Sequence, residues 1–106
     1  MTRREIRLER ILNDVCNYYG IKVSDIKGRS RLRKFVEARH IFCYLAREHT
    51  YSSLSEIGLA VNRDHSNVVH SVRKVKHLKD VYKSIQKEIS EISSDESLYD
   101  KGSMCI

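Results

Sequence analysis

The sequence has few residues that break helices. Its 106 residues include no proline and no tryptophan, and only four glycines. Proline interrupts helices and glycine weakens them, whereas Leu, Glu, Lys and Arg, which recur throughout this chain, favour them. We therefore expect an all-α fold. The length suits one domain with a modest core better than a two-domain enzyme.

Long apolar runs are absent as well. No stretch approaches the roughly 18 apolar residues that a membrane span requires, and the charged start of the chain is not followed by the apolar core of a signal peptide. The three cysteines, Cys16, Cys43 and Cys105, have neither an even count nor the spacing of metal ligands. We expect a cytoplasmic, nucleoid-associated protein without membrane contact, in which Cys16 and Cys43 are buried free thiols.

Positive charge is unevenly distributed along the chain. The formal net charge is +6, and basic residues concentrate in 22–48 and 63–79, whereas 80–106 is mainly acidic. Two basic blocks separated by a weakly charged segment favour one assembled surface for a polyanion. Charge alone does not separate DNA from RNA or from an anionic membrane.

Periodic apolar residues and helix-capping signals predict about five to six helices in residues 1–92. Thr2 and Glu5 have capping-box spacing before the first helix, and Gly20 ends it. Ser24 is expected to cap a single turn before Gly28. A long central helix covers 31–48, a short one follows the capping box of Ser53 and Glu56, and the next begins after Asp64. We prefer a bend near Asp80 before a final helix whose apolar stripe is Val81, Tyr82, Ile85, Ile89 and Ile92. Residues 93–106 are expected to form an acidic, mobile tail.

Residues 54–69 read as a helix-turn-helix. Ile57, Val61 and Val68 would pack the two helices together, and Gly58 would allow their backbones to approach. A polar set remains outward at the start of the second helix, and such a helix fits the major groove of DNA. Asp64 can accept a hydrogen bond from cytosine, His65 can contact a base edge or a thymine methyl, and Asn67 can address adenine or a phosphate. The alternative is that Asp64, His65, Ser66 and Asn67 only cap the helix and face water.

A basic segment, 27–34, precedes the central helix. An arginine beside small residues can enter a narrow minor groove while its neighbours pair with phosphates. The alternative is a solvated run of charge. Together with the helix-turn-helix, this segment would form the second arm of a clamp on DNA. Further candidates for phosphate contact are Arg47, Arg73, Lys74 and Lys76.

Three stretches resemble the C-terminal DNA-binding domain of the bacterial replication initiator DnaA. They are Val23-Ser24-Asp25-Ile26-Lys27-Gly28-Arg29-Ser30-Arg31, then Ala38-Arg39-His40-Ile41-Phe42-Cys43-Tyr44-Leu45-Ala46-Arg47-Glu48, and Ser53-Leu54-Ser55-Glu56-Ile57-Gly58 leading to Arg63-Asp64-His65-Ser66-Asn67-Val68-Val69-His70. The resemblance covers roughly residues 9–92. It implies a compact helical fold related to the Trp-repressor class, which binds a short asymmetric box on double-stranded DNA as a monomer.

The resemblance also assigns roles to single residues. It implies that Arg31 enters the minor groove and that Arg39, Asp64, His65 and Ser66 face bases, to which the residues themselves add Asn67. Contacts to the DNA backbone are expected from Lys27, Arg29, Arg33, His40, Arg47, Leu54, Ser55, Arg63, Arg73 and Lys74. Two departures from the family's pattern matter: the turn is one residue shorter than usual, and Ser66-Asn67 replaces two threonines. The preferred box is therefore expected to differ from the family's.

The sequence has no Gly-rich phosphate loop, so we expect no ATPase activity, no bound nucleotide, no cofactor and no metal. An enzyme or metal site built from the histidines lacks both a nucleophile–base pair and zinc spacing. Two more functions stay open, that of a generic helix-turn-helix transcription regulator and that of a protein-interaction module that docks the 81–92 stripe on a partner helix. RNA binding is disfavoured, because exposed aromatic platforms are not evident.

Overall fold

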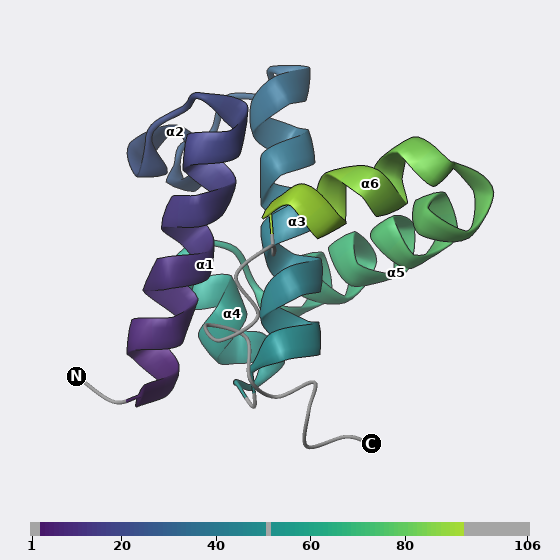
Figure 1. Cartoon of the computed structure of the whole chain (residues 1–106). Coiled ribbons are helices and arrows are strands. Elements are labelled where there is room, and N and C mark those ends of the chain that lie inside the picture. The colour runs from purple at the N-terminus through teal and green to yellow at the C-terminus, as the bar shows by residue number, and fades with distance from the viewer. Residues whose placement is uncertain (1–2, 51, 93–106) are drawn as a thin grey trace.

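A computed structural model describes residues 3–50 and 52–92 of the chain, and all its regular elements in these ranges are helices. In Figure 1, α3 runs through the middle of the molecule, with α1 on one side and α5 and α6 on the other. This arrangement confirms the predicted all-α fold and its number of helices. The six helices are α1 (Arg3–Tyr19), α2 (Val23–Lys27), α3 (Arg33–His49), α4 (Leu54–Ala60), α5 (His65–Val81) and α6 (Lys83–Ile92).

The central helix α3 is buried on more than one face. Phe42 and Leu45 have no exposed surface, and the whole stretch 41–46 is buried. Because α1 and α5 pack on different sides of α3, its buried residues extend around more than one face of the helix. Phe35, near the start of the helix, is only half-buried. Cys16 and Cys43 are buried free thiols, as predicted, and burial raises the pKa of Cys43 to about 12.

The connection from α1 to α3 depends on a left-handed glycine. Gly20 has φ +67°, and the next amide, that of Ile21, donates to the carbonyl of Cys16 at 3.0 Å. The prediction that Ser24 caps α2 is wrong. Lys22 is the N-cap residue, because the carboxylate of Asp25 reaches back to accept a hydrogen bond from its amide at 3.0 Å. Thr2, the predicted cap of α1, lies outside the described residues.

The predicted bend between the last two helices is present. α5 ends at Val81, the amide of Tyr82 donates to the carbonyl of Leu78 at 2.8 Å, and α6 then turns back beside α5 (Figure 1). Only the later part of the predicted stripe is in the core. Ile89 and Ile92 are buried and Ile85 is partly buried, whereas the side chains of Val81 and Tyr82, next to the break, are more than half exposed. The predicted acidic tail lies outside the described residues.

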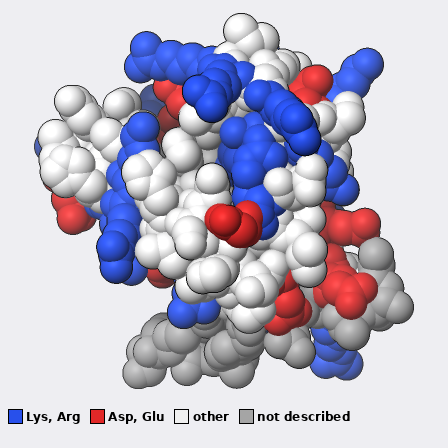
Figure 2. All heavy atoms as spheres, turned by 180° about the vertical axis from the view of Figure 1, so that it is seen from behind, with Lys and Arg blue, Asp and Glu red and all other residues white. Residues whose placement is uncertain are grey.

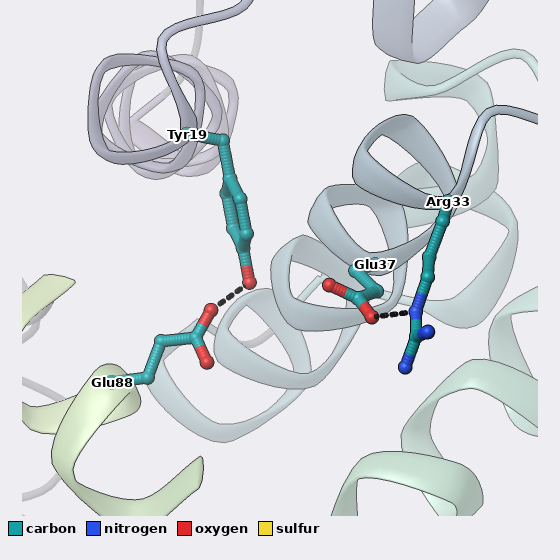
Figure 3. A network of polar contacts seen from close by, with 4 residues as sticks. All are labelled: Tyr19, Arg33, Glu37 and Glu88. Atoms are coloured by element: carbon teal, nitrogen blue, oxygen red, sulfur yellow. Dashed lines mark hydrogen bonds and ion pairs between the residues drawn. The ribbon is translucent and has the colours of Figure 1, made fainter. Parts of the chain in front are cut away.

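Tyrosine–glutamate contacts join α6 to the end of α1. The hydroxyl of Tyr19 donates to a carboxylate oxygen of Glu88, which Figure 3 shows reaching toward it from α6. The neighbouring hydroxyl of Tyr18 donates to Glu91 Oε2 at 3.1 Å in a more exposed position. Burial and the Glu88 carboxylate raise the pKa of Tyr19 far above its ordinary value, so this hydroxyl remains a donor. The first and last helices of the bundle are thus held together by side chains.

None of the described helices is both long enough and apolar enough to cross a membrane.

Candidate nucleic-acid interface

The first helix of the helix-turn-helix, α4, is fixed at its start by a capping box. The amide of Ser53 donates to Glu56 Oε1 at 3.0 Å, and the amide of Glu56 donates to Ser53 Oγ at 3.1 Å. Ile57, Val61 and Val68 have no exposed surface, so they lock α4 against α5 as the sequence predicted. The pairing of these helices is therefore set by side chains that leave the outer edge of α5 free.

The turn between α4 and α5 depends on Gly58 and Asn62. The amide of Arg63 donates to the carbonyl of Gly58 at 2.8 Å, and a Cβ at position 58 would lie only 2.3 Å from the carbonyl oxygen of Arg63. Asn62 has φ 58°, a left-handed conformation that asparagine tolerates better than most residues. The predicted close approach at Gly58 is confirmed, and it brings the start of α5 directly against α4.

A polar edge is exposed where α5 begins. Asp64 is the N-cap residue, and its carboxylate accepts a hydrogen bond from the amide of Asn67 at 3.0 Å. The side chains of Asp64, His65, Ser66 and Asn67 are all exposed. The opposite face of α5 is buried through Val68, Val72 and Val75. The predicted division of this helix into a packing face and a free face is present.

The basic loop, residues 27–33, consists of the last residue of α2, the connection 28–32 and the first residue of α3. The side chains of Lys27, Arg29, Arg31 and Arg33 are exposed, and Leu32 donates its amide to Ser30 Oγ at 3.3 Å. Arg33 also forms an exposed ion pair with Glu37, one turn along α3, at 2.9 Å (Figure 3). Such a pair contributes little to stability, so Arg33 is available to exchange this partner for another anion.

One backbone oxygen brings the basic loop and the helix-turn-helix together. The carbonyl of Gly28 accepts a hydrogen bond from Arg63 Nη2 at 2.7 Å and a longer one from Arg39 Nη2 at 3.4 Å. Arg63 lies in the turn between α4 and α5, and Arg39 lies on α3. Two regions far apart in the sequence, each predicted to contact DNA, are therefore neighbours.

Arg39 occupies a different position from the other predicted base readers. Its side chain is only 6% exposed, and its Nε donates to the carbonyl of Ile26 at 3.0 Å. Burial lowers the pKa of this guanidinium, and the positive charge of Arg63 lowers it further. In this conformation Arg39 holds the start of the basic loop. The base contact that the resemblance implies for it stays a prediction.

His40, predicted to lie near a phosphate, is half-buried. Its Nδ1 is 2.7 Å from the hydroxyl of Ser71, a buried residue of α5 that the sequence analysis did not single out. Burial lowers the pKa of His40 to about 4, and the charge of Lys74 acts in the same direction. The ring is neutral at neutral pH, so it can offer a phosphate a hydrogen bond but no charge.

The remaining basic candidates lie on exposed surface. The side chains of Arg47, Arg73, Lys74 and Lys76 are exposed, as is Ser55, whereas Leu54 is half-buried. Figure 2 shows lysine and arginine side chains gathered over the upper half of one face of the molecule. A surface cleft of about 520 Å³ is lined by Arg31 of the loop, His40 of α3 and Lys74 of α5. Glu37 and Glu88 also line this cleft, so basic side chains of the loop and of α5 flank it together with acidic ones.

A metal centre has no support in the described part of the chain. Within residues 3–50 and 52–92, no three or more His, Cys, Asp and Glu side chains come together as metal ligands.

Comparisons with known proteins agree with this geometry. A family profile described as "Bacterial dnaA protein helix-turn-helix" matches residues 8–75. The chromosomal replication initiator protein DnaA of Enterococcus faecalis is 36% identical over 94 residues, which cover 88% of this chain and 21% of that protein. For the protein of the same name from Bacteroides thetaiotaomicron the identity is 39% over 92 residues, 86% of this chain and 20% of the relative.

A third relative, the DnaA protein of Thermoanaerobacter sp., is 42% identical over 72 residues, 68% of this chain and 16% of its own length. The chain therefore spans about a fifth of the length of the curated relatives it matches. The matched segment includes the basic loop, α3 and the helix-turn-helix. From the family match and these identities, the chain belongs to the bacterial DnaA helix-turn-helix family and corresponds to its C-terminal domain.

Proposed function

We propose that this chain binds double-stranded DNA at specific sites, as the box-reading domain of a replication initiator. The observation that carries the proposal is the exposed polar start of α5 beside a basic loop that is hydrogen-bonded to the same turn. An α-helix fits the major groove, and a short basic segment fits the adjacent minor groove. Family membership supports the same function.

The base readers in this proposal are the exposed residues at the start of α5. Asp64 accepts a hydrogen bond from a cytosine amino group with the oxygen that does not cap the helix. His65 contacts a base edge or a thymine methyl. Ser66 and Asn67, which stand where the family has two threonines, lack the threonine methyls, so their apolar contact with thymine methyls is weaker than in the family. Arg31 reads the width of the minor groove, where negative potential attracts a guanidinium.

The phosphate contacts are assigned to residues that surround these readers. They position the domain and make binding depend on salt, but they carry no sequence information directly. One copy of the domain is proposed to occupy one site. The charged members of this set of backbone contacts are Lys27, Arg29, Arg33, Arg47, Arg73 and Lys74. Its neutral members, His40, Leu54 and Ser55, contact the DNA backbone without adding to the salt dependence.

The test is selection of duplexes from a random pool with the purified chain. A defined site should emerge, and a variant carrying Asp64→Asn and His65→Ala should lose the preference at the corresponding base pairs. Asn retains the capping oxygen, so α5 keeps its start while the carboxylate is removed. Enrichment of the same site by this variant would reject α5 as the reader.

The salt dependence of binding checks the phosphate contacts separately. We expect the logarithm of the binding constant to fall with the logarithm of salt concentration with a slope on the order of −4 to −8, because several counterions are released. Arg73→Ala should reduce the magnitude of this slope by about 0.9 without changing the selected site. A flat response to salt would contradict the proposed contacts.

A further inference from the structure

The carbonyl of Gly28 is the point at which the two proposed DNA-reading elements touch. Arg63 Nη2 donates to it at 2.7 Å across 35 residues of sequence. This carbonyl belongs to the C-cap residue of α2, and the basic loop continues directly from it toward Arg31. The position of the loop therefore depends on a side chain that comes from the helix-turn-helix.

The side chain of Arg63 is held in place by its own turn. Its backbone amide is bonded to Gly58, and its Nη1 donates to the carbonyls of Asn62 at 2.9 Å and Val61 at 3.3 Å. These contacts leave Nη2 directed at Gly28. A guanidinium makes all these bonds at once because its donors form a planar fork, which an ammonium cannot reproduce.

Arg39, from α3, donates to the same Gly28 carbonyl. It bonds the carbonyls of Ile26 and Gly28, so both guanidinium groups meet at one oxygen. No carboxylate of the described residues forms an ion pair with either arginine. The hydrogen-bonding capacity of both groups is directed at main-chain carbonyls, which is the pattern of residues that fix a backbone.

We propose that Arg63 is a positioning and specificity-determining residue, which couples minor-groove reading by the basic loop to major-groove reading by α5. This inference rests on the proposed function and changes the role expected for Arg63 from a phosphate contact to an internal one. When the loop is tied to the turn, Arg31 is delivered to the groove next to the one that α5 occupies. The two grooves are then read in a fixed relation.

The first test needs no DNA. Backbone order parameters from ¹⁵N relaxation are measured for residues 28–32 in wild type, Arg63→Lys and Arg63→Ala. Positioning by Arg63 predicts a fall from about 0.8 to about 0.6 or less in both variants. Arg73→Lys, an exposed substitution on α5, is the matched control and should leave the loop unchanged. Order parameters that stay at the wild-type level in both Arg63 variants would overturn the inference.

The second test is a double-mutant cycle on a selected duplex. In wild type, Arg31→Ala removes the minor-groove contact. In the Arg63→Lys background, the fold-loss of affinity caused by Arg31→Ala should be at least about threefold smaller than in wild type, because the loop no longer places Arg31 in the groove. Arg63→Lys retains the charge, so the salt slope should stay near the wild-type value while specificity for A·T-rich minor grooves falls.

A phosphate-contact role gives the opposite results. Arg63→Lys would then keep most of the affinity, the effects of Arg31→Ala and Arg63→Ala would multiply independently, and Arg63→Ala would reduce the salt slope by about 0.9. Those results would overturn the inference while leaving the proposed function standing. If wild type selects no duplex at all, the proposed function fails, and the order parameters alone decide whether Arg63 positions the loop.

Discussion

The two ends of α5 are fixed by different means. At its start, the main chain at Gly58 and Asn62 and the capping carboxylate of Asp64 set the geometry of the turn. At its far end, side chains do this work: Lys79 Nζ donates to the hydroxyl of Tyr44 at 3.2 Å, and Gln86 Nε2 donates to the carbonyl of Lys79 at 2.8 Å. The first end leaves His65 and Ser66 exposed beside the capping Asp64, whereas the second uses its polar side chains for contacts with α3 and α6.

This difference accounts for the location of the proposed reading edge. A ligand-binding surface needs side chains whose hydrogen-bonding groups are unoccupied but whose backbone is rigid. The start of α5 meets both conditions, because Asp64 caps the helix and His65 and Ser66 remain exposed. The far end of α5 meets these conditions less well, because Lys79 and Tyr44 already bond each other. Substitutions that weaken one end of α5 should therefore leave the other end largely intact.

The largest effect is expected from Gly58→Ala. The added Cβ would lie 2.3 Å from the carbonyl oxygen of Arg63, so the turn must shift, and the free energy of unfolding should fall by about 3 kcal/mol. Urea denaturation measures this change. Gly20→Ala is the control, because an added Cβ there meets open space. The backbone φ of +67° still disfavours alanine, so a loss of about 1 kcal/mol is expected. Equal losses at the two positions would contradict the close approach at Gly58.

His65→Ala should leave stability unchanged and remove about 2 kcal/mol of affinity for the selected site, the usual value of a good base contact. Fluorescence anisotropy with the selected duplex and with a scrambled one measures this loss of specific binding. His77→Ala, an exposed substitution farther along α5, is the matched control and should leave the ratio of the two affinities intact. If both variants behave alike, the start of α5 has no special role.

Tyr19→Phe should weaken the attachment of α6 to the end of α1. It removes the hydroxyl that donates to Glu88 and leaves a carboxylate without that partner, so a loss of about 1 kcal/mol in unfolding free energy is expected. Affinity for DNA should not change. Tyr18→Phe removes the more exposed contact with Glu91, and only a few tenths of a kcal/mol are expected there, roughly as for other exposed pairs. A larger loss at Tyr18 would reverse this ranking.

Stability is also expected to depend on pH through His40. Its pKa is lowered from 6.5 to about 4 by burial, with Lys74, His70 and Arg39 adding repulsion and Glu37 opposing them. Between these values the unfolded chain binds more protons than the folded one, so stability is present above pH 6.5 and declines as pH falls toward 4. The decline in thermal midpoint from about pH 7.5 to about pH 5 should be smaller in His40→Gln. An identical decline would remove His40 as its source.

Local sequence patterns predicted much of the fold because they report local physics. Ser53 with Glu56, Asp64 as a cap and Gly58 at the close approach all act within a few residues, and the structure confirms each. The prediction that Ser24 caps α2 was wrong for an equally local reason, since the Asp25 carboxylate accepts the hydrogen bond from the amide of Lys22. The exposure of Tyr82 was missed although the bend was predicted, because the apolar pattern continues through the bend, where side chains next to the break do not reach the core.

The candidate site was harder to predict where its parts are distant in sequence. The exposed edge of α5 follows from one helix, so the pattern was sufficient for Asp64 and His65. The burial of Arg39 depends on the carbonyl of Ile26, and the contact of Arg63 depends on Gly28, and neither acceptor carries a side-chain signal. Main-chain acceptors are present at every residue, and for this reason sequence alone does not indicate which one an arginine will find.

The shared carbonyl of Gly28 has a consequence for protein engineering. Because one oxygen receives hydrogen bonds from α3 and from the turn before α5, the basic loop is not a self-contained cassette. Grafting residues 27–33 onto another helical scaffold would transfer its charges but not its orientation. A faithful transplant must include both guanidinium donors, and must keep α3 and the turn before α5 in the same relative position.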